Sequence, residues 1–240
     1  MTRARIHVIP TSAPDDVTGL NRLIESDALD PKRLIAILGK TEGNGCVNDF
    51  TRAFAVSALT RCLGADADRV SMVMSGGTEG CLSPHLVTFE VLDESGAGPA
   101  MAVGSDISRD LAPFEIGTMA QVDCVAASVR TAMASAGLDA PPEVHFVQIK
   151  CPLLSKDRMM TSQKPVATTD TLKSMGLSRG ASALGVAVAL GEIDLAAAEK
   201  ALGSGDKNIW SSRARTSAGV EMMGHEVKVL GMSAAWCGPL

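Results

Sequence analysis

The sequence contains the same order of features twice. An apolar run ending in lysine, residues 33–40 ("RLIAILGK"), is followed by a helical pattern, a second apolar run and the turn Ser75-Gly76-Gly77-Thr78-Glu79. Another lysine-ended run, residues 143–150 ("EVHFVQIK"), is followed later by Ser217-Ala218-Gly219-Val220-Glu221. An internal repeat predicts two similar folding units. The lysine-to-serine spacing is nearly twice as long in the second unit, which predicts an insertion there.

Apolar runs bounded by turn residues predict strands, and apolar residues at helical spacing predict helices. In the first unit the helix is expected to be capped by Asn48, to end at Gly64 and to carry Phe50, Phe54, Ala58 and Cys62 on one face. The expected strands are 33–40, 69–74, 86–92, 143–150 and 226–232, and the expected helices are 48–64, 116–137, 178–190 and 194–202. This order predicts an α/β (α+β-like) fold of repeated β-α-β units, with unit A at 1–104 and unit B at 105–240.

Composition excludes several classes of protein. The net charge is −5, aromatic residues make up 3% and tyrosine is absent, which argues against a nucleic-acid-binding surface. Six cysteines without a C-x-x-C motif, and an N-terminus without an apolar leader, predict reduced thiols in the cytoplasm. The longest apolar run, residues 181–191, is shorter than the roughly 20 residues that cross a bilayer, so no membrane partner is expected.

The two serines and the two lysines are candidates for nucleophilic chemistry. A serine between a strand and small residues can expose its Oγ beside backbone N–H groups, which stabilise an oxyanion. Lys40 and Lys150 end apolar strands, where loss of water or a second cation lowers the pKa of an amine enough for it to accept a proton from serine. Ordinary Ser-Gly turns and strand-end lysines that reach for solvent are the simpler alternatives. A third near-match, "SAGLD" from Ser135, lies at an expected helix end and is interpreted as a cap.

Arginine, glutamate and histidine side chains are the other groups that bear on substrate and metal binding. Arg52 and Arg179 lie near the expected starts of helices, where a guanidinium can bind the carbonyl oxygens of a planar substrate or form a surface ion pair. Glu79 and Glu221 either orient the lysines or stabilise the turns, and the sequence does not choose between these. The four histidines have no metal-ligand spacing, so no metal or catalytic cofactor is expected.

Several blocks of sequence resemble the ring-opening amidohydrolases, the cyanuric acid hydrolase and barbiturase family. They cover most of the chain in the family's order: "ILGKTEGNGCVND" (37–49), "MSGGTEGCLSPH" (74–85), "HFVQIKCPLL" (145–154), "SRGASALGVA" (178–187), "SAGVE" (217–221) and "VKVLG" (227–231). The resemblance implies similar units around a pseudo-threefold axis, each supplying one Lys, one Arg and one Ser. It also implies a third unit with a structural metal site, which this chain lacks, so we expect a truncated chain that is inactive alone.

The resemblance also assigns roles to individual residues. It makes Ser217 the nucleophile and Lys150 its base, with Lys40 supporting Ser75. The residues expected to contact the ring are Arg52, Ser75, Gly76, Arg179 and Ala218. Ala218 stands where the family often has Ser or Gly, which matters little if its backbone N–H is the functional group.

The predicted function is hydrolysis of a C–N bond in a cyclic imide or ureide, of the cyanuric acid or barbiturate type. One alternative is a Ser-Lys amidase for open-chain amides, which needs a single Lys-Arg-Ser set rather than two. The other is a non-catalytic ligand-binding or assembly fragment of this family. A homo-oligomer is expected, although the Ala-rich stretch 181–190 suits a core as well as an interface and does not choose between them.

Overall fold

The structure is a computed structural model that describes residues 1–77, 83–204, 209 and 211–238. The chain forms two compact units. Unit 1 consists of Met1–Val103 together with Ser233–Leu240, and unit 2 consists of Gly104–Met232. Strand β5, Ala100–Ile107, crosses the boundary between them.

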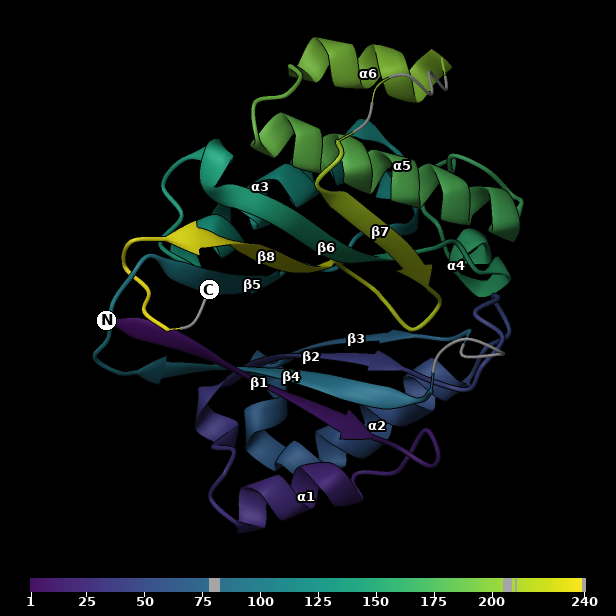
Figure 1. Ribbon diagram of the computed structural model, residues 1–240. Helices are drawn as coiled ribbons and strands as arrows, with labels where there is room; N and C mark the ends of the chain where they lie inside the picture. Colours follow the sequence, from purple (N-terminus) through teal and green to yellow (C-terminus); the bar gives the residue numbers. More distant parts are fainter. Residues whose placement is uncertain (78–82, 205–208, 210, 239–240) are drawn as a thin grey trace. The chain divides into compact units, whose positions relative to one another are not determined.

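Unit 1 is built on a four-stranded sheet in the order β1-β4-β2-β3 (Figure 1). Strands β2 and β3 are parallel and are joined through helix α2, which makes a β-α-β arrangement. Strand β4 runs antiparallel to both β1 and β2. The elements are β1 Thr2–Pro10, α1 Thr18–Glu25, β2 Leu34–Lys40, α2 Thr51–Leu63, β3 Ser71–Ser75 and β4 His85–Asp93, with 3₁₀ turns at Pro31–Arg33 and Gly64–Arg69.

Helices α1 and α2 cover one face of this sheet and close an apolar core (Figure 1). The sheet contributes Ile9, Ile37, Met72, Met74 and Leu86, and the helices contribute Leu20, Ala55, Leu59 and Leu63. One carboxylate, Glu90, is fully buried on β4. It accepts hydrogen bonds from Arg5 Nε and Nη2, both at 2.8 Å, and from Asp30 N at 2.9 Å. These donors replace the water that the charge loses on burial.

The first helix begins later than predicted and buries a different face. Helix α2 starts at Thr51, and Asn48 does not cap it. Instead Asp49 accepts a hydrogen bond from Thr51 N at 3.0 Å. Phe50 and Phe54 are 72% and 40% exposed, because the inward stripe of the helix begins at Thr51 and Arg52 and continues through Ala55, Ala58, Leu59 and Leu63. The predicted apolar face is therefore wrong for the two phenylalanines, whereas Gly64 ends the helix with a φ of 58°, as expected.

Unit 2 repeats the sheet of unit 1 in the order β5-β8-β6-β7. Strands β6 and β7 are parallel like β2 and β3, and β8 runs antiparallel to β6 as β4 does to β2. The pairing register also shifts at the same place in both sheets: between Leu34 and Ala36 where β2 pairs with β4, and between Val144 and Phe146 where β6 pairs with β8. The α/β class and the repeated-unit fold are thus confirmed. The strands are β6 Val144–Pro152, β7 Ala214–Gly219 and β8 Glu226–Ser233.

The helices of unit 2 also lie on one face of their sheet (Figure 1). Helices α3 and α5 pack together, and Gly185 of α5 lies so close to Val125 of α3 that a Cβ would collide with it. Between β6 and β7 the chain forms three helices, where unit 1 has α2 and a 3₁₀ turn between β2 and β3, so the predicted insertion lies here. The helices are α3 Met119–Ser135, α4 Lys156–Met160, α5 Thr171–Ala189 and α6 Leu195–Ser204, with 3₁₀ turns at Pro113–Glu115 and Pro141–Glu143.

Helix α5 begins well before the predicted position 178. Asp170 caps its N-terminus by accepting a hydrogen bond from Lys173 N at 3.0 Å. The polar residues of its first two turns resemble a loop in sequence. Strands β1 and β5 and helices α1 and α4 were not predicted. Among the described residues, no helix is long and apolar enough to cross a membrane.

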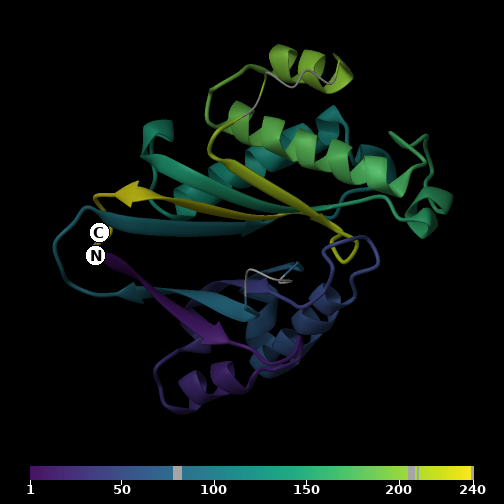
Figure 2. The same cartoon turned by 45° about the vertical axis from the view of Figure 1, so that its right-hand side comes forward.

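The described segment that follows β8, residues 234–238, belongs to unit 1 and contacts the start of its first strand, β1, which carries the N mark in Figure 2. Thr2 N donates to Ala235 O at 3.2 Å, and Cys237 N donates to Thr2 O at 2.7 Å. Thr2 also forms a bridge with Trp236, which is 3% exposed. Unit 1 is therefore completed by both ends of the described chain.

Candidate active site

Each unit brings its predicted lysine and serine together on neighbouring parallel strands. Lys40 of β2 is the register partner of Ser75 of β3, and Lys150 of β6 is the register partner of Ser217 of β7. Paired residues on adjacent strands project from the same face of a sheet. The two lysine–serine pairs thus occupy equivalent places in the two sheets.

In unit 1 the lysine amine contacts the serine and the turn that follows it. Lys40 Nζ donates to Gly76 O at 2.6 Å and lies 3.4 Å from Ser75 Oγ. Ser75 is the last residue of β3, which is the strand-to-turn junction that the sequence predicts. Glu79, whose role the sequence left open, lies outside the described residues.

The predicted ligand Arg52 is held in unit 1 by a buried aspartate that the sequence analysis missed. Arg52 is 3% exposed, and its Nη2 donates to Cys46 O at 2.9 Å. Its Nε lies 3.9 Å from Asp49 Oδ2. Asp49 also accepts hydrogen bonds from Gly45 N at 2.8 Å and from Thr51 Oγ1 at 2.5 Å. The sequence signal for this role of Asp49 is its position two residues before the start of α2, where an aspartate commonly accepts backbone hydrogen bonds.

The environment of Asp49 keeps it ionised. Burial alone raises the pKa of this carboxyl, but hydrogen bonds from Thr51 and Gly45 and the charge of Arg52 outweigh burial, so its pKa lies below the usual value. Asp49 therefore remains a carboxylate that fixes the loop around Arg52.

Gly76 has no room for a side chain. A Cβ there would collide with Asp49 Oδ2 and crowd the backbone of Gly45 and Gly43. Gly77 N donates to Gly43 O at 2.5 Å, which ties the serine turn to the loop that carries Asp49. At the equivalent position of unit 2 the chain has Ala218, which is 4% exposed and belongs to β7.

In unit 2 the lysine is buried and paired with a carboxylate. Lys150 is 1% exposed, and its Nζ lies 3.4 Å from Glu221 Oε1. Glu221 thus contacts the lysine, one of the two roles that the sequence left open. Ser217 lies inside β7 rather than in a turn, since the strand continues to Gly219. Its Oγ is buried and has no hydrogen-bond partner within the described part of the chain, so the expectation of an exposed hydroxyl is wrong.

The other predicted ligand, Arg179, does not begin a helix. It lies in the interior of α5, and its side chain is exposed. Its charge acts on the thiol of Cys151, the residue after Lys150. The two arginines thus differ: Arg52 is buried in a loop network and Arg179 is exposed on a helix.

Strand β8 adds charged groups that the sequence analysis did not consider. Glu226 is the register partner of Lys150. Lys228, two residues further, is 1% exposed, and its Nζ lies 3.1 Å from Glu226 Oε2. A lysine between two apolar residues, in "VKV", was the signal available in the sequence.

A buried polar network links the elements of unit 2 near this site. His225 is fully buried, with Nε2 3.0 Å from Gln121 Nε2 and Nδ1 3.3 Å from Ser108 Oγ. The amide nitrogen of Gln121 can only donate, so Nε2 of His225 accepts and Nδ1 carries the proton. Gln121 also donates to Ser178 Oγ at 2.8 Å, and Ser178 Oγ donates to Pro152 O at 2.6 Å. Burial first, and then the charge of Arg109, lower the pKa of His225 to about 4.

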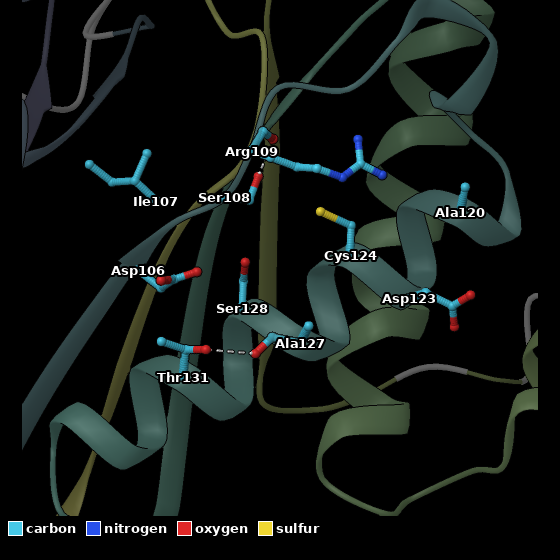
Figure 3. Close-up of a pocket in the computed structure, with 10 residues that line it drawn as sticks. All are labelled: Asp106, Ile107, Ser108, Arg109, Ala120, Asp123, Cys124, Ala127, Ser128 and Thr131. Atoms are coloured by element: carbon cyan, nitrogen blue, oxygen red, sulfur yellow. Dashed lines mark hydrogen bonds between the residues drawn. The ribbon is translucent and has the colours of Figure 1, made fainter.

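A pocket of about 600 Å³ in unit 2 adjoins this network at Ser108 and Arg109 but is lined by neither lysine–serine pair (Figure 3). It lies between the end of β5 and helix α3, with Asp106, Ser108 and Arg109 on one side and Cys124 and Ser128 on the other. The guanidinium of Arg109 is bound to both carboxylate oxygens of Glu115, at 2.8 and 2.7 Å. None of the predicted site residues lines this pocket.

Within the described residues, His, Cys, Asp and Glu side chains nowhere gather in a group of three or more that could hold a metal ion. The structural metal that the resemblance assigns to a third unit stays a prediction.

Residues 5–240 match the profile of a protein family described as amidohydrolase ring-opening protein. The chain belongs to this family. The match covers both units and therefore every predicted site residue.

Several curated relatives in the ring-opening family are named cyanuric acid amidohydrolase. The protein from Azorhizobium caulinodans is 53% identical over 250 residues, which cover all of this chain and 70% of the relative. The protein from Methylobacterium sp. (strain 4-46) is 50% identical, over 99% of this chain and 66% of the relative. This chain of 240 residues thus spans about two thirds of the length of these relatives.

Solved structures of this family have the same fold. The crystal structure of a cyanuric acid hydrolase from A. caulinodans matches the whole chain with a TM-score of 0.96 at 52% identity, covering 70% of that protein. A second cyanuric acid hydrolase structure matches 98% of the chain with a TM-score of 0.92 at 40% identity, covering 69% of that protein. The family thus accounts for the repeated-unit architecture.

Proposed function

We propose that this chain is part of an enzyme that opens a six-membered cyclic imide or ureide by hydrolysing a ring C–N bond, on substrates such as cyanuric acid or barbituric acid. In this proposal Ser217 is the nucleophile and Lys150 is its base. The observation that carries it is the register pairing of these two residues on adjacent parallel strands, repeated by Lys40 and Ser75. The relatives named cyanuric acid amidohydrolase support the substrate class.

The surroundings of Lys150 suit a residue that gives up and regains a proton. Burial disfavours an ammonium ion, and so does the neighbouring charge of Lys228, whereas Glu221 at 3.4 Å favours it. Burial and the charge of Lys228 thus favour the neutral amine, and Glu221 favours the ammonium ion. A base that also returns its proton needs such a balance.

The reaction then proceeds in two stages. Neutral Lys150 accepts the Oγ proton of Ser217 while Oγ attacks a ring carbonyl carbon. The ring C–N bond breaks, and the Lys150 ammonium donates its proton to the leaving nitrogen, which leaves an ester on Ser217. Lys150 next takes a proton from water, the hydroxide attacks the ester carbon, and Ser217 leaves with that proton. The product is the ring-opened acid.

Strand β7 is suited to hold the oxyanion. It lies at the end of its sheet, with β6 as its one neighbour among the described strands. Alternate N–H groups along such an edge strand point away from the ladder and are available to a ligand. We assign this role to the backbone around Ala218 and Gly219. The electrostatic effect of one such donor is worth about 3 kcal/mol of the barrier.

Ring binding is assigned to Arg52, Ser75, Gly76, Arg179 and Ala218. The contact of Lys40 Nζ with Ser75 Oγ and with Gly76 O supports the auxiliary role of Lys40, since it orients both groups. Two Lys-Arg-Ser sets match a ring that presents the same carbonyl and N–H pattern more than once. A cytoplasmic location and a homo-oligomeric state stay predictions of this proposal.

The test is ring-opening activity of Ser217→Ala, measured as loss of cyanuric acid and, separately, of barbituric acid, in the protein as its host produces it. We expect loss of turnover by at least about 10³-fold with an unchanged circular dichroism spectrum. Ser135→Ala is the matched control: it belongs to the third "SAG" sequence, at the end of α3, where its Oγ donates to Ala132 O at 2.9 Å. Full activity of Ser217→Ala would refute the assignment, and turnover of open-chain amides but of neither ring would favour a simpler amidase.

A further inference from the structure

A second buried lysine, Lys228 of β8, lies beside the proposed base, Lys150 of β6. Strand β8 adjoins β6 on the side away from β7, which carries Ser217. Glu226 pairs with Lys150 across β8 and β6, and Lys228 pairs with Gln148. Residues two apart on a strand share a face, so Lys228 and Lys150 are diagonal neighbours on one face of the sheet. Such neighbours lie roughly 7–8 Å apart at the backbone, within reach of long side chains. Both lysines are 1% exposed.

The carboxylate of Glu226 is engaged by Lys228. Lys228 Nζ lies 3.1 Å from Glu226 Oε2 and donates a hydrogen bond to it. Burial is the main reason that the pKa of Lys228 falls to about 8. Glu226 opposes this shift, and the charge of Lys150 adds to it. The two amines therefore act on each other electrostatically, and Lys228 binds the Glu226 carboxylate.

We propose that Lys228 is a positioning residue of the ring-opening reaction, which holds the Glu226 carboxylate and sets a positive charge beside Lys150. This inference rests on the proposed role of Lys150 as the base. A second cation disfavours the ammonium form of Lys150, and it offsets part of the attraction that the Glu226 carboxylate exerts on that form. Lys150 then reaches its neutral form at a lower pH.

Other charged groups of unit 2 also bear on this site. Glu221 lies 3.4 Å from Lys150 Nζ, and its charge also acts on Arg158 of α4. Arg215 and Ser217 of β7 share the face of Lys150, because Arg215 is the register partner of Gln148. Arg179 of α5 acts on Cys151 next to the base. These groups are the same in every variant below, so they do not produce the differences between variants.

The test compares the pH dependence of kcat/KM for ring opening in Lys228→Met, Lys228→Arg and Glu226→Gln. Substrate titration is common to all variants and cancels. The acid limb is the part of the profile where kcat/KM rises with pH. In Lys228→Met we expect this limb to move to higher pH by about one unit, so that at a given pH on the limb kcat/KM is about tenfold lower than in the original protein. In Lys228→Arg, which keeps the positive charge, the acid limb lies at the same pH as in the original protein. Glu226→Gln moves it to lower pH, because it removes the negative charge next to the base.

Opposite shifts from neighbouring substitutions separate an electrostatic role from a merely structural one. Lys200→Met, at an exposed position of α6, is the matched control and keeps the original profile. An unchanged limb in a folded Lys228→Met variant overturns the inference while leaving the proposed function intact. If Lys228→Met does not fold, Glu226→Gln decides alone, and an unchanged limb there also overturns it. Activity retained by Ser217→Ala is instead a failure of the proposed function.

Discussion

Removing the buried imidazole of His225 should flatten the acid side of the stability profile. Its ring nitrogens contact Gln121 and Ser108, and its pKa is lowered to about 4, mainly by burial. In the unfolded chain the pKa of histidine is about 6.5. Between these two values the unfolded state binds more protons than the folded state. The contribution of His225 is therefore fully present above pH 6.5 and is lost as the pH falls toward 4.

The size of this contribution follows from the two pKa values. A shift of one unit corresponds to about 1.4 kcal/mol, so the lowered pKa of His225 costs roughly 2.5 kcal/mol of unfolding free energy between pH 7.5 and pH 4.5. The structural cause is specific: a proton on Nε2 would place an N–H group against the donating amide of Gln121, 3.0 Å away. Two buried donors then face each other with no acceptor between them.

Urea unfolding of the original chain and of His225→Gln at pH 7.5 and 4.5 measures this difference. Carboxylates such as Asp49, whose pKa is lowered in the folded state, also contribute less to the unfolding free energy on acidification. The quantity that matters is therefore the difference between the two proteins in how much unfolding free energy each loses from pH 7.5 to 4.5. We expect the loss between these pH values to be about 2.5 kcal/mol smaller in His225→Gln. His145→Gln, at an exposed position of β6, should follow the original chain. Equal pH slopes for His225→Gln and the original chain would refute the reasoning.

Two further substitutions test unit 1. Gly76→Ala forces a Cβ against Asp49, so we expect a loss of about 1–3 kcal/mol in unfolding free energy, together with a loss of ring-opening activity. The control is Gly203→Ala in α6, where an added Cβ meets no atom within 4 Å, and thermal unfolding that is equal for both variants would contradict the prediction. Glu90→Gln removes the charge that Arg5 binds through two hydrogen bonds of 2.8 Å, and should lower the unfolding free energy by about 2 kcal/mol. Urea unfolding at pH 7 measures this, and an unchanged midpoint would rule it out.

The strands that carry the lysines were predictable because central parallel strands are apolar on both faces. Such runs are visible without knowledge of the fold. Strand β1 was not predictable in the same way. Its residues Arg3 and Arg5 look like loop residues until Glu94 and Glu90, far along the chain, neutralise them at 2.7 and 2.8 Å. Local sequence does not contain that information.

The same distinction applies to the candidate site. The pairing of Lys150 with Ser217 could be inferred because the order of features recurs, and recurrence predicts equivalent positions on equivalent strands. Lys228 and His225 could not be inferred, because their significance depends on register and on partners in other elements. The sequence predicts a helix that starts beside Arg179, because nothing in the local pattern marks Asp170 as the cap of an earlier start.

The hydrogen bonds between Thr2 and the segment around Trp236 have a consequence for synthesis on the ribosome. The first unit begins to emerge early, yet the contacts that cover the start of its edge strand wait until nearly the whole described chain has been translated. Contacts between residues so distant in sequence form slowly, since the intervening chain must first become ordered. The nascent first unit therefore exposes one end of its edge strand β1 throughout translation of the second, when a ribosome-bound chaperone would find it accessible.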